Sequence, residues 1–116
     1  MGYPQSFRTV PADRFPELAV LLERIRQTYP PREVLLYGSR ARGDATPDSD
    51  WDLKVIVDDA APEWLMSPLF GWKVQEGSGV YADVSYARES EFDADLGVPN
   101  SAAFEIARNG IRLNAI

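Results

Sequence analysis

Three aspartates at alternating positions, Asp48, Asp50 and Asp52, follow a Gly-Ser pair and two arginines in the stretch YGSRARGDATPDSDWDL. Carboxylates held close together repel one another unless a positive charge lies between them. The stretch is therefore either a solvated loop or a place built to hold a metal ion. The apolar run LKVIV that follows has the β-branched content of a strand, so the acidic stretch leads directly into a sheet.

The spacing of Asp50 and Asp52 fits a cation site. On a strand these two residues share one face and lie about 6.6 Å apart, at roughly 3.3 Å per residue. Both can lean onto one ion or a pair of ions, since two-metal sites hold their ions roughly 3.5–4 Å apart. Magnesium prefers oxygen ligands completed by phosphate and water. We therefore expect Mg²⁺ here, with Mn²⁺ as the alternative.

The residues ahead of the aspartates are suited to binding phosphate. Gly38 allows a close approach of the backbone. Ser39, at the expected start of a helical turn, offers a hydroxyl and N–H groups to a phosphate. Arg40 and Arg42 can add charge-assisted hydrogen bonds. The sequence thus predicts phosphate-binding residues immediately before the carboxylates.

Other motifs fit this stretch poorly. An EF-hand loop shares the D-x-D-x-D beginning but needs glycine at its sixth position and glutamate at its twelfth; Leu53 and Asp59 stand there. A P-loop needs a lysine and a hydroxyl residue after its second glycine, where this chain has Asp44 and Ala45. The tripeptide RGD at 42–44 is too short to indicate adhesion.

Composition narrows the chemistry further. With 116 residues, 45% of them hydrophobic and 26% charged, the chain is expected to fold as one domain over 1–116. It contains no cysteine and no histidine, which excludes thiolate-zinc sites and catalysis by Ser-His-Asp or Cys-His groups. The net charge of −6 argues against binding long nucleic acid by phosphate neutralisation. Without a signal-peptide pattern or a membrane-length apolar run, a cytoplasmic protein is expected.

The elements that must position the motif can be predicted around it. Apolar residues between Asp13 and Tyr29 recur at helical spacing, and Pro30 and Pro31 end that helix. EVLLY indicates a buried strand ended by Gly38, and DWDLKVIV indicates a second strand. GWKVQE and VYADVSYA suggest two further strands joined at residues 77–79.

A last helix is expected from Asn100 or Ser101 through Asn109, with Gly110 as its stop and IRLNAI returning as a short strand. The segment WLMSPLFGW, at 64–72, is rich in large apolar residues. It can be core or an exposed docking patch. The order of elements predicts an α/β or α+β domain in which the helices pack on one face of the sheet.

The Gly-Ser pair, ten intervening residues and Asp-x-Asp on a strand resemble the signature of the nucleotidyltransferase superfamily that includes DNA polymerase β. GSRARGDATPDSDWDL is similar to its minimal nucleotidyltransferase branch nearly throughout. The resemblance is clear over 34–58 and extends to Asp83 in VYADVSYA. It implies an α+β (α/β) fold of the polymerase β type, with a small mixed sheet and helices packed mainly on one face.

The resemblance also implies a mechanism. Asp50, Asp52 and Asp83 would be the catalytic and metal-binding carboxylates, with Asp83 orienting or deprotonating an acceptor hydroxyl. That hydroxyl would attack the α-phosphorus of a nucleoside triphosphate, ATP being favoured, and pyrophosphate would leave. Minimal members often act as antitoxins that modify a HEPN-type toxin, which makes such a protein the expected partner. A small-molecule transferase of the aminoglycoside type and a catalytically silent binding module remain alternatives.

Overall fold

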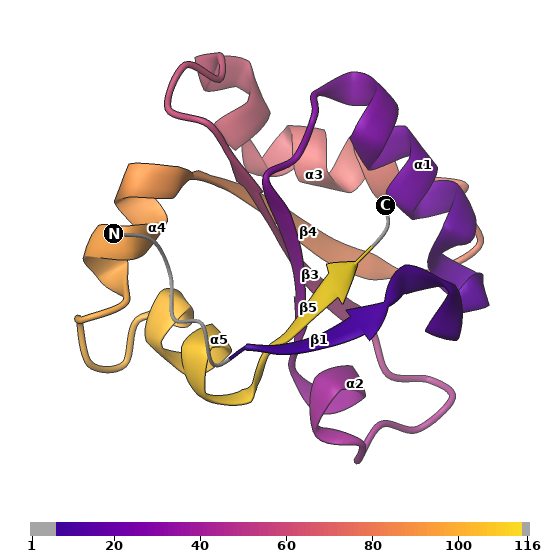
Figure 1. Cartoon of the computed structure of the whole chain (residues 1–116). Helices are drawn as coiled ribbons and strands as arrows, with labels where there is room; N and C mark the ends of the chain where they lie inside the picture. The colour runs from indigo at the N-terminus through magenta and orange to yellow at the C-terminus, as the bar shows by residue number, and fades with distance from the viewer. Residues whose placement is uncertain (1–6, 115–116) are drawn as a thin grey trace.

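The computed structural model describes residues 7–114, which build one five-stranded sheet in the order β1-β5-β2-β3-β4. β1 and β5 are parallel, β3 and β4 are parallel, and β2 runs antiparallel to both of its neighbours (Figure 1). This confirms the predicted fold class, an α+β domain with a small mixed sheet. The strands are β1 Arg8–Pro11, β2 Glu33–Tyr37, β3 Trp51–Val57, β4 Ala82–Arg88 and β5 Ile111–Asn114.

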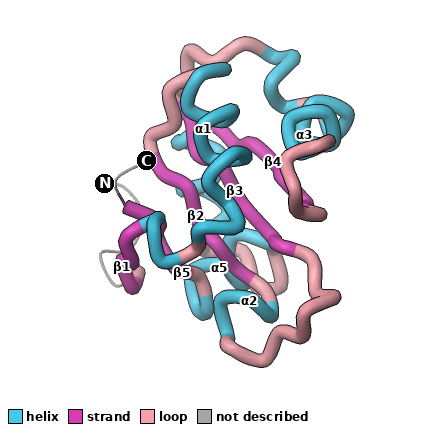
Figure 2. Tube along the Cα trace, turned by 90° about the vertical axis from the view of Figure 1, so that its right-hand side faces the viewer, coloured by secondary structure: helices cyan, strands magenta, loops and turns pink. Residues whose placement is uncertain are grey.

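Helices lie on both sides of this sheet. Figures 1 and 2 show α1 and α3 on one side of the strands and α5 on the other, with α4 beside α5 in Figure 1. Within residues 7–114, no helix has the length and apolar content to cross a membrane. The helices are α1 Ala19–Thr28, α2 Ser39–Arg42, α3 Pro68–Gln75, α4 Glu89–Asp95 and α5 Ala102–Asn109, with 3-10 turns at Ala12–Arg14, Pro16–Leu18 and Glu63–Met66.

Two apolar clusters fill the space between the helices and the sheet. The larger one joins α1 and α3 to the face of the sheet that carries Leu53 and Val55. The smaller one joins α4 and α5 to Leu35 and Ile56, which project from the opposite face. The expected one-sided packing therefore holds only for the larger core. Leu35 and Ile56 are fully buried apolar side chains, and the second pair of helices removes them from water.

Two local predictions were wrong. Residues 13–18 form 3-10 turns, and α1 begins at Ala19 rather than near Asp13. Residues 71–75, predicted as a strand, belong to α3, where Ser67 caps the helix by accepting from the Leu69 N–H and Pro68 is its first residue. β4 is consequently not half of the hairpin predicted with residues 71–76. It pairs in parallel with β3, and α3 lies in the crossover connection that parallel strands require.

The end of the chain follows the prediction. α5 is capped by Ser101, whose hydroxyl accepts from the Phe104 N–H, and Gly110 ends the helix. β5 then runs between β1 and β2 in the middle of the sheet. The last predicted strand therefore exists, although the expected extension to residue 116 lies outside the described residues.

Candidate functional site

β3 and β4 place two of the predicted carboxylates side by side. Asp52 is the register partner of Asp83 in the parallel ladder, and Tyr37 of β2 is the partner of Asp52 on its other side. Neighbouring strands are about 4.8 Å apart, so partners in register project from the same face of the sheet. A row of Tyr37, Asp52 and Asp83 therefore crosses the face that α4 and α5 cover only in part.

Gly38 follows this row directly and lies against Asp52. Its backbone has φ 74° and ψ −158°, a region that is essentially restricted to glycine. A Cβ at this position would lie 2.2 Å from Oδ2 of Asp52. The structure thus brings the Gly-Ser turn and the Asp-x-Asp strand into contact, and the contact depends on the missing side chain.

Ser39 begins α2, a single helical turn of four residues. The N–H groups of Ala41 and Arg42 both bond to the Gly38 carbonyl at 3.0 Å, and Gly43 closes the turn in a left-handed conformation with φ 88°. The turn therefore follows directly on the residue that lies against Asp52. Ser39 is at a helix start, as the sequence predicted.

The two predicted arginines have different surroundings. Arg40 donates to the Ser49 carbonyl from Nη2 at 2.8 Å and from Nε at 3.2 Å, and its guanidinium lies 4.3 Å from the Trp51 ring centroid. It holds the loop before β3 in place. Arg42 is half-exposed, pairs with Asp44 at 3.3 Å, and is the arginine whose charge acts on Asp52.

Asp50 stands apart from the other two aspartates. It is exposed and precedes the first residue of β3, so it does not share the regular strand geometry with Asp52 as predicted. With Asp83 it lines a cavity of about 500 Å³ beside β4. Across residues 7–114, no three or more acidic side chains are grouped closely enough to hold a metal ion. The structure assembles the Asp52–Asp83 pair and leaves Asp50 at the edge of the site.

The sequence as a whole was compared with known proteins. A family model described as a nucleotidyltransferase domain matches residues 18–106, which include Gly38, Asp52 and Asp83. The chain belongs to the nucleotidyltransferase domain family. The family resemblance predicted from the motif is thereby confirmed.

Solved structures similar to this nucleotidyltransferase include the crystal structure of a "putative nucleotidyltransferase" from Sulfolobus solfataricus, with 26% sequence identity and a TM-score of 0.45. The similarity covers 72% of this chain and 75% of the other. A search of curated proteins gave no match.

Electrostatics single out Asp52 within the nucleotidyltransferase site. Burial raises the pKa of its carboxyl group, and the negative charges of Asp83 and Asp50 raise the pKa further, while Arg42 acts in the opposite direction. Burial also raises the pKa of the Tyr37 phenol, again with contributions from Asp52 and Asp83. The site face therefore carries more negative charge than its surroundings neutralise.

Two residues on this face, Tyr37 and Lys54, have positions that the sequence did not fully predict. Tyr37 was missed because its place beside Asp52 depends on the β2–β3 register. Lys54 was expected on the aspartates' face, and it lies one row behind them, opposite Ser85. Burial lowers the pKa of its ammonium group, against the attraction of Asp83 and Asp95. Lys54 is thus a partly buried positive charge next to the carboxylates.

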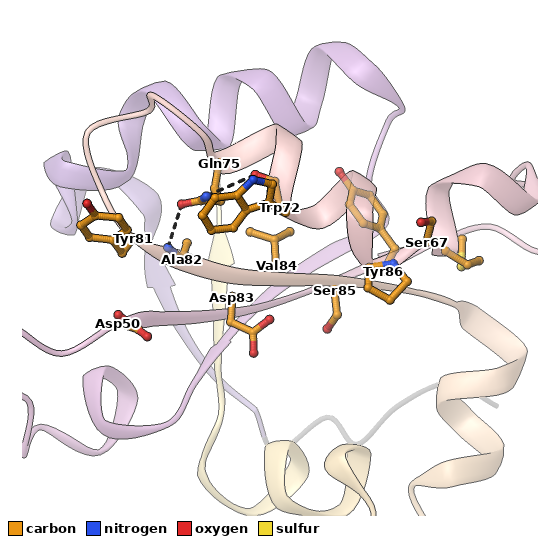
Figure 3. A pocket seen from close by; sticks show the side chains of 12 residues that line it. Asp50, Ser67, Trp72, Gln75, Tyr81, Ala82, Asp83, Val84, Ser85 and Tyr86 are labelled. Atoms are coloured by element: carbon orange, nitrogen blue, oxygen red, sulfur yellow. Dashed lines mark hydrogen bonds between the residues drawn. The ribbon is translucent and has the colours of Figure 1, made fainter.

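Sequence reasoning also missed Gln75, at the end of α3. It is 3% exposed and its side-chain Oε1 accepts from the Ala82 N–H at 3.2 Å (Figure 3). The predicted strand over 71–76 concealed this contact. Polarity alone gave no signal, because an isolated glutamine is most often a solvated residue.

Proposed function

We propose that this nucleotidyltransferase moves a nucleoside monophosphate, AMP from ATP being favoured, onto an acceptor hydroxyl. The observation that carries the proposal is the Asp52–Asp83 pair in register, with the Gly-Ser turn against Asp52. The acceptor oxygen attacks the α-phosphorus and forms the new P–O bond. The bond to the bridging oxygen breaks, pyrophosphate leaves, and the proton of the hydroxyl passes to Asp83.

The donor set of the site fits a hard divalent cation. Its ligands would be carboxylate oxygens, which Mg²⁺ and Mn²⁺ prefer. The repulsion that raises the pKa of Asp52 is the interaction that a cation relieves. Asp52 and Asp83 would hold the ion, and Asp50, which is exposed, would complete the set by turning toward them. When bound, the ion supplies neutralisation of the triphosphate charge.

The protein's own groups bind and orient the reactants in this scheme. Gly38 and Ser39 place the backbone of α2 beside the triphosphate, and Arg42 contributes a positive charge. Asp83, exposed at the cavity, accepts the proton. Holding the hydroxyl and the phosphorus in one geometry is the main source of acceleration in phosphoryl chemistry of this kind.

The acceptor that we favour is a protein, of the HEPN toxin type implied by the family resemblance. The cavity beside Asp83 is open, and two of the large apolar residues that line it, Trp72 and Tyr81, are exposed. Trp64 and Leu69, in the segment at 64–72 to which Trp72 belongs, are exposed as well. Exposed apolar surface next to a reactive group suits a partner that supplies part of the enclosure. Leu65, in the same segment, is fully buried, so the segment at 64–72 serves both as core and as surface.

The test combines nucleotide binding with product analysis. The purified chain, ATP and Mg²⁺ are mixed with the protein encoded in the adjacent reading frame, and both proteins are weighed by mass spectrometry. We expect one added AMP on a hydroxyl side chain of the partner. Asp52→Asn should abolish the transfer, whereas Asp48→Asn, the same change at an exposed loop residue ahead of the site, should leave it unchanged.

Two results would count against this function. ATP binding of equal affinity with and without Mg²⁺ would remove the metal site. If the partner stayed unmodified while a small hydroxylated compound was modified rapidly, the chain would instead be a small-molecule nucleotidyltransferase.

A further inference from the structure

β4, which carries Asp83, is the outermost strand of the sheet, so strand pairing holds it on one side only. The Trp51 N–H bonds to the Tyr81 carbonyl, which means that the backbone groups of Tyr81 point toward β3. Backbone groups alternate along a strand in a parallel ladder, and those of Ala82 and Val84 therefore point outward. These two residues flank Asp83 in the sequence.

The side chain of Gln75, in α3, accepts a hydrogen bond from the outward-pointing N–H of Ala82. Its Oε1 accepts this hydrogen bond at 3.2 Å, and its Nε2 donates to the Trp72 carbonyl at 3.2 Å (Figure 3). Both ends of the side-chain amide thus have partners, one on β4 and one within α3. A buried glutamine is uncommon, and this one is used to tie the helix to the residue before Asp83.

Gly71, one turn earlier in α3, lies on the residue after Asp83. A Cβ at this position would be 2.0 Å from the Val84 carbonyl oxygen and 3.1 Å from its carbon. The obstacle is backbone, which cannot turn away as a side chain can. Glycine therefore lets α3 lie directly on the outer edge of β4.

α3 is itself fixed to the rest of the fold. Arg24 of α1 donates from Nη1 to the Val74 carbonyl at 3.2 Å and to the Glu76 carbonyl at 2.6 Å. Its Nη2 donates to the Gly77 carbonyl at 3.4 Å. These bonds satisfy carbonyl groups at the C-terminal end of the helix, where intrahelical partners are absent. The end of α3 that carries Gln75 is accordingly held in place from the core side.

We propose that Gly71 and Gln75 are positioning residues for Asp83. α3 takes the place of the neighbouring strand that β4 lacks, fixes Ala82 and Val84, and thereby holds the Asp83 carboxylate in register with Asp52. This inference rests on the proposed function, since it assigns to Asp83 the role given above. Gln75 also lines the cavity beside Asp83, and its part in this proposal is the hydrogen bond to the Ala82 N–H.

The principal test is Gln75→Met, which keeps the length of the side chain and removes the acceptor for the Ala82 N–H. We expect the single-turnover rate of transfer to fall about tenfold or more, as is typical for the loss of a supporting contact. At a saturating concentration of Mg²⁺, the affinity for ATP should stay within about twofold, because Gly38, Ser39 and Asp52 are untouched. Gly71→Ala should produce the same division between rate and affinity.

Val74→Ala is the matched control, since it shortens a buried core side chain of the same helix and leaves both Gly71 and Gln75 unchanged. It should lower the melting temperature but leave the rate of the folded protein unchanged. If Gln75→Met transfers at the wild-type rate, or if Val74→Ala loses as much rate as Gln75→Met does, the proposal is overturned.

Two measurements separate this proposal from the proposed function. Hydrogen exchange at the Ala82 amide should be faster in Gln75→Met than in the wild type, and Mn²⁺ titration should show weaker binding by about tenfold. If the wild type transfers nothing, the proposed function fails, and these two readouts still decide the positioning role. Unchanged exchange together with unchanged Mn²⁺ affinity would overturn it.

Discussion

Gly38→Ala tests the contact on which the site depends. The substitution adds one methyl group at φ 74° and ψ −158°, and that methyl would lie 2.2 Å from Oδ2 of Asp52. Two separate costs follow, one in the backbone of residue 38 and one in the placement of the Asp52 carboxylate. The backbone cost predicts a loss of stability, and the displacement of the carboxylate predicts a loss of catalytic rate.

The backbone cost is about 1–3 kcal/mol, the typical strain of a non-glycine residue in this region. The steric cost follows from the distance, since ordinary contact begins at 3.4 Å and the carboxylate must retreat by about 1 Å. A misplacement of ~1 Å can reduce a rate about 100-fold. We therefore expect Gly38→Ala to lose roughly that factor in single-turnover transfer while most of the protein stays folded.

Gly43→Ala is the matched control for Gly38→Ala. Gly43 closes the same turn with φ 88° and ψ 9°, but nothing lies within 4 Å of the position of its Cβ. Its cost should be limited to about 1–2 kcal/mol of left-handed backbone strain. Unfolding by urea and single-turnover transfer are measured for both variants. Equal rates for Gly38→Ala and wild type, or an equal loss for Gly43→Ala, would refute the reasoning.

Three further predictions concern charge. Because the pKa of Asp52 is raised in the folded protein, the folded state binds more protons than the unfolded state above about pH 4, and metal-free stability falls as pH rises through the raised pKa. Asp52→Asn should therefore melt higher than wild type near about pH 7 but not near about pH 3, as calorimetry without metal would show. Lys54→Met should tighten Mn²⁺ binding by about eightfold, since a unit positive charge about 6.6 Å from a divalent ion costs ~1.3 kcal/mol even at the dielectric constant of water. An unchanged Mn²⁺ titration would show that the charge of Lys54 does not act on the bound ion. Arg42→Ala should weaken ATP binding with little change in melting temperature, whereas Arg40→Ala should lower the melting temperature because Arg40 holds the loop over Trp51; the reverse pattern in calorimetry and thermal melting would show that the roles are exchanged.

The sequence was informative where the site is local. A strand that ends in glycine, a helical turn beginning at Ser39 and an apolar strand after Asp50 are short-range features, and composition and spacing predict them. The structure adds that β3 begins at Trp51, so that Asp50 lies outside the ladder. The alternation of faces holds only within a strand, so it does not fix the direction of Asp50, which precedes the first residue of β3.

The long-range part of the site required the fold. GWKVQE has the alternation of a strand, but Pro68 and the Ser67 cap start a helix that continues through it. Only with α3 as a crossover do β3 and β4 become parallel and bring Asp83 opposite Asp52. The orientation of Arg40 toward the Ser49 carbonyl, rather than toward a phosphate, likewise depends on a loop conformation that its sequence does not specify.

The charge balance of the site couples the binding of nucleotide to the binding of a cation. Burial and the charges of Asp83 and Asp50 already raise the pKa of Asp52, so the site disfavours further negative charge. A triphosphate brings several negative charges, and Arg42 and Lys54 are the cations that act on these carboxylates in the part of the chain that is described. Nucleotide and cation are therefore expected to bind together, each raising the affinity for the other by the same factor. The acidic character of the site, which by itself repels a phosphate ligand, is thus the source of its dependence on the metal.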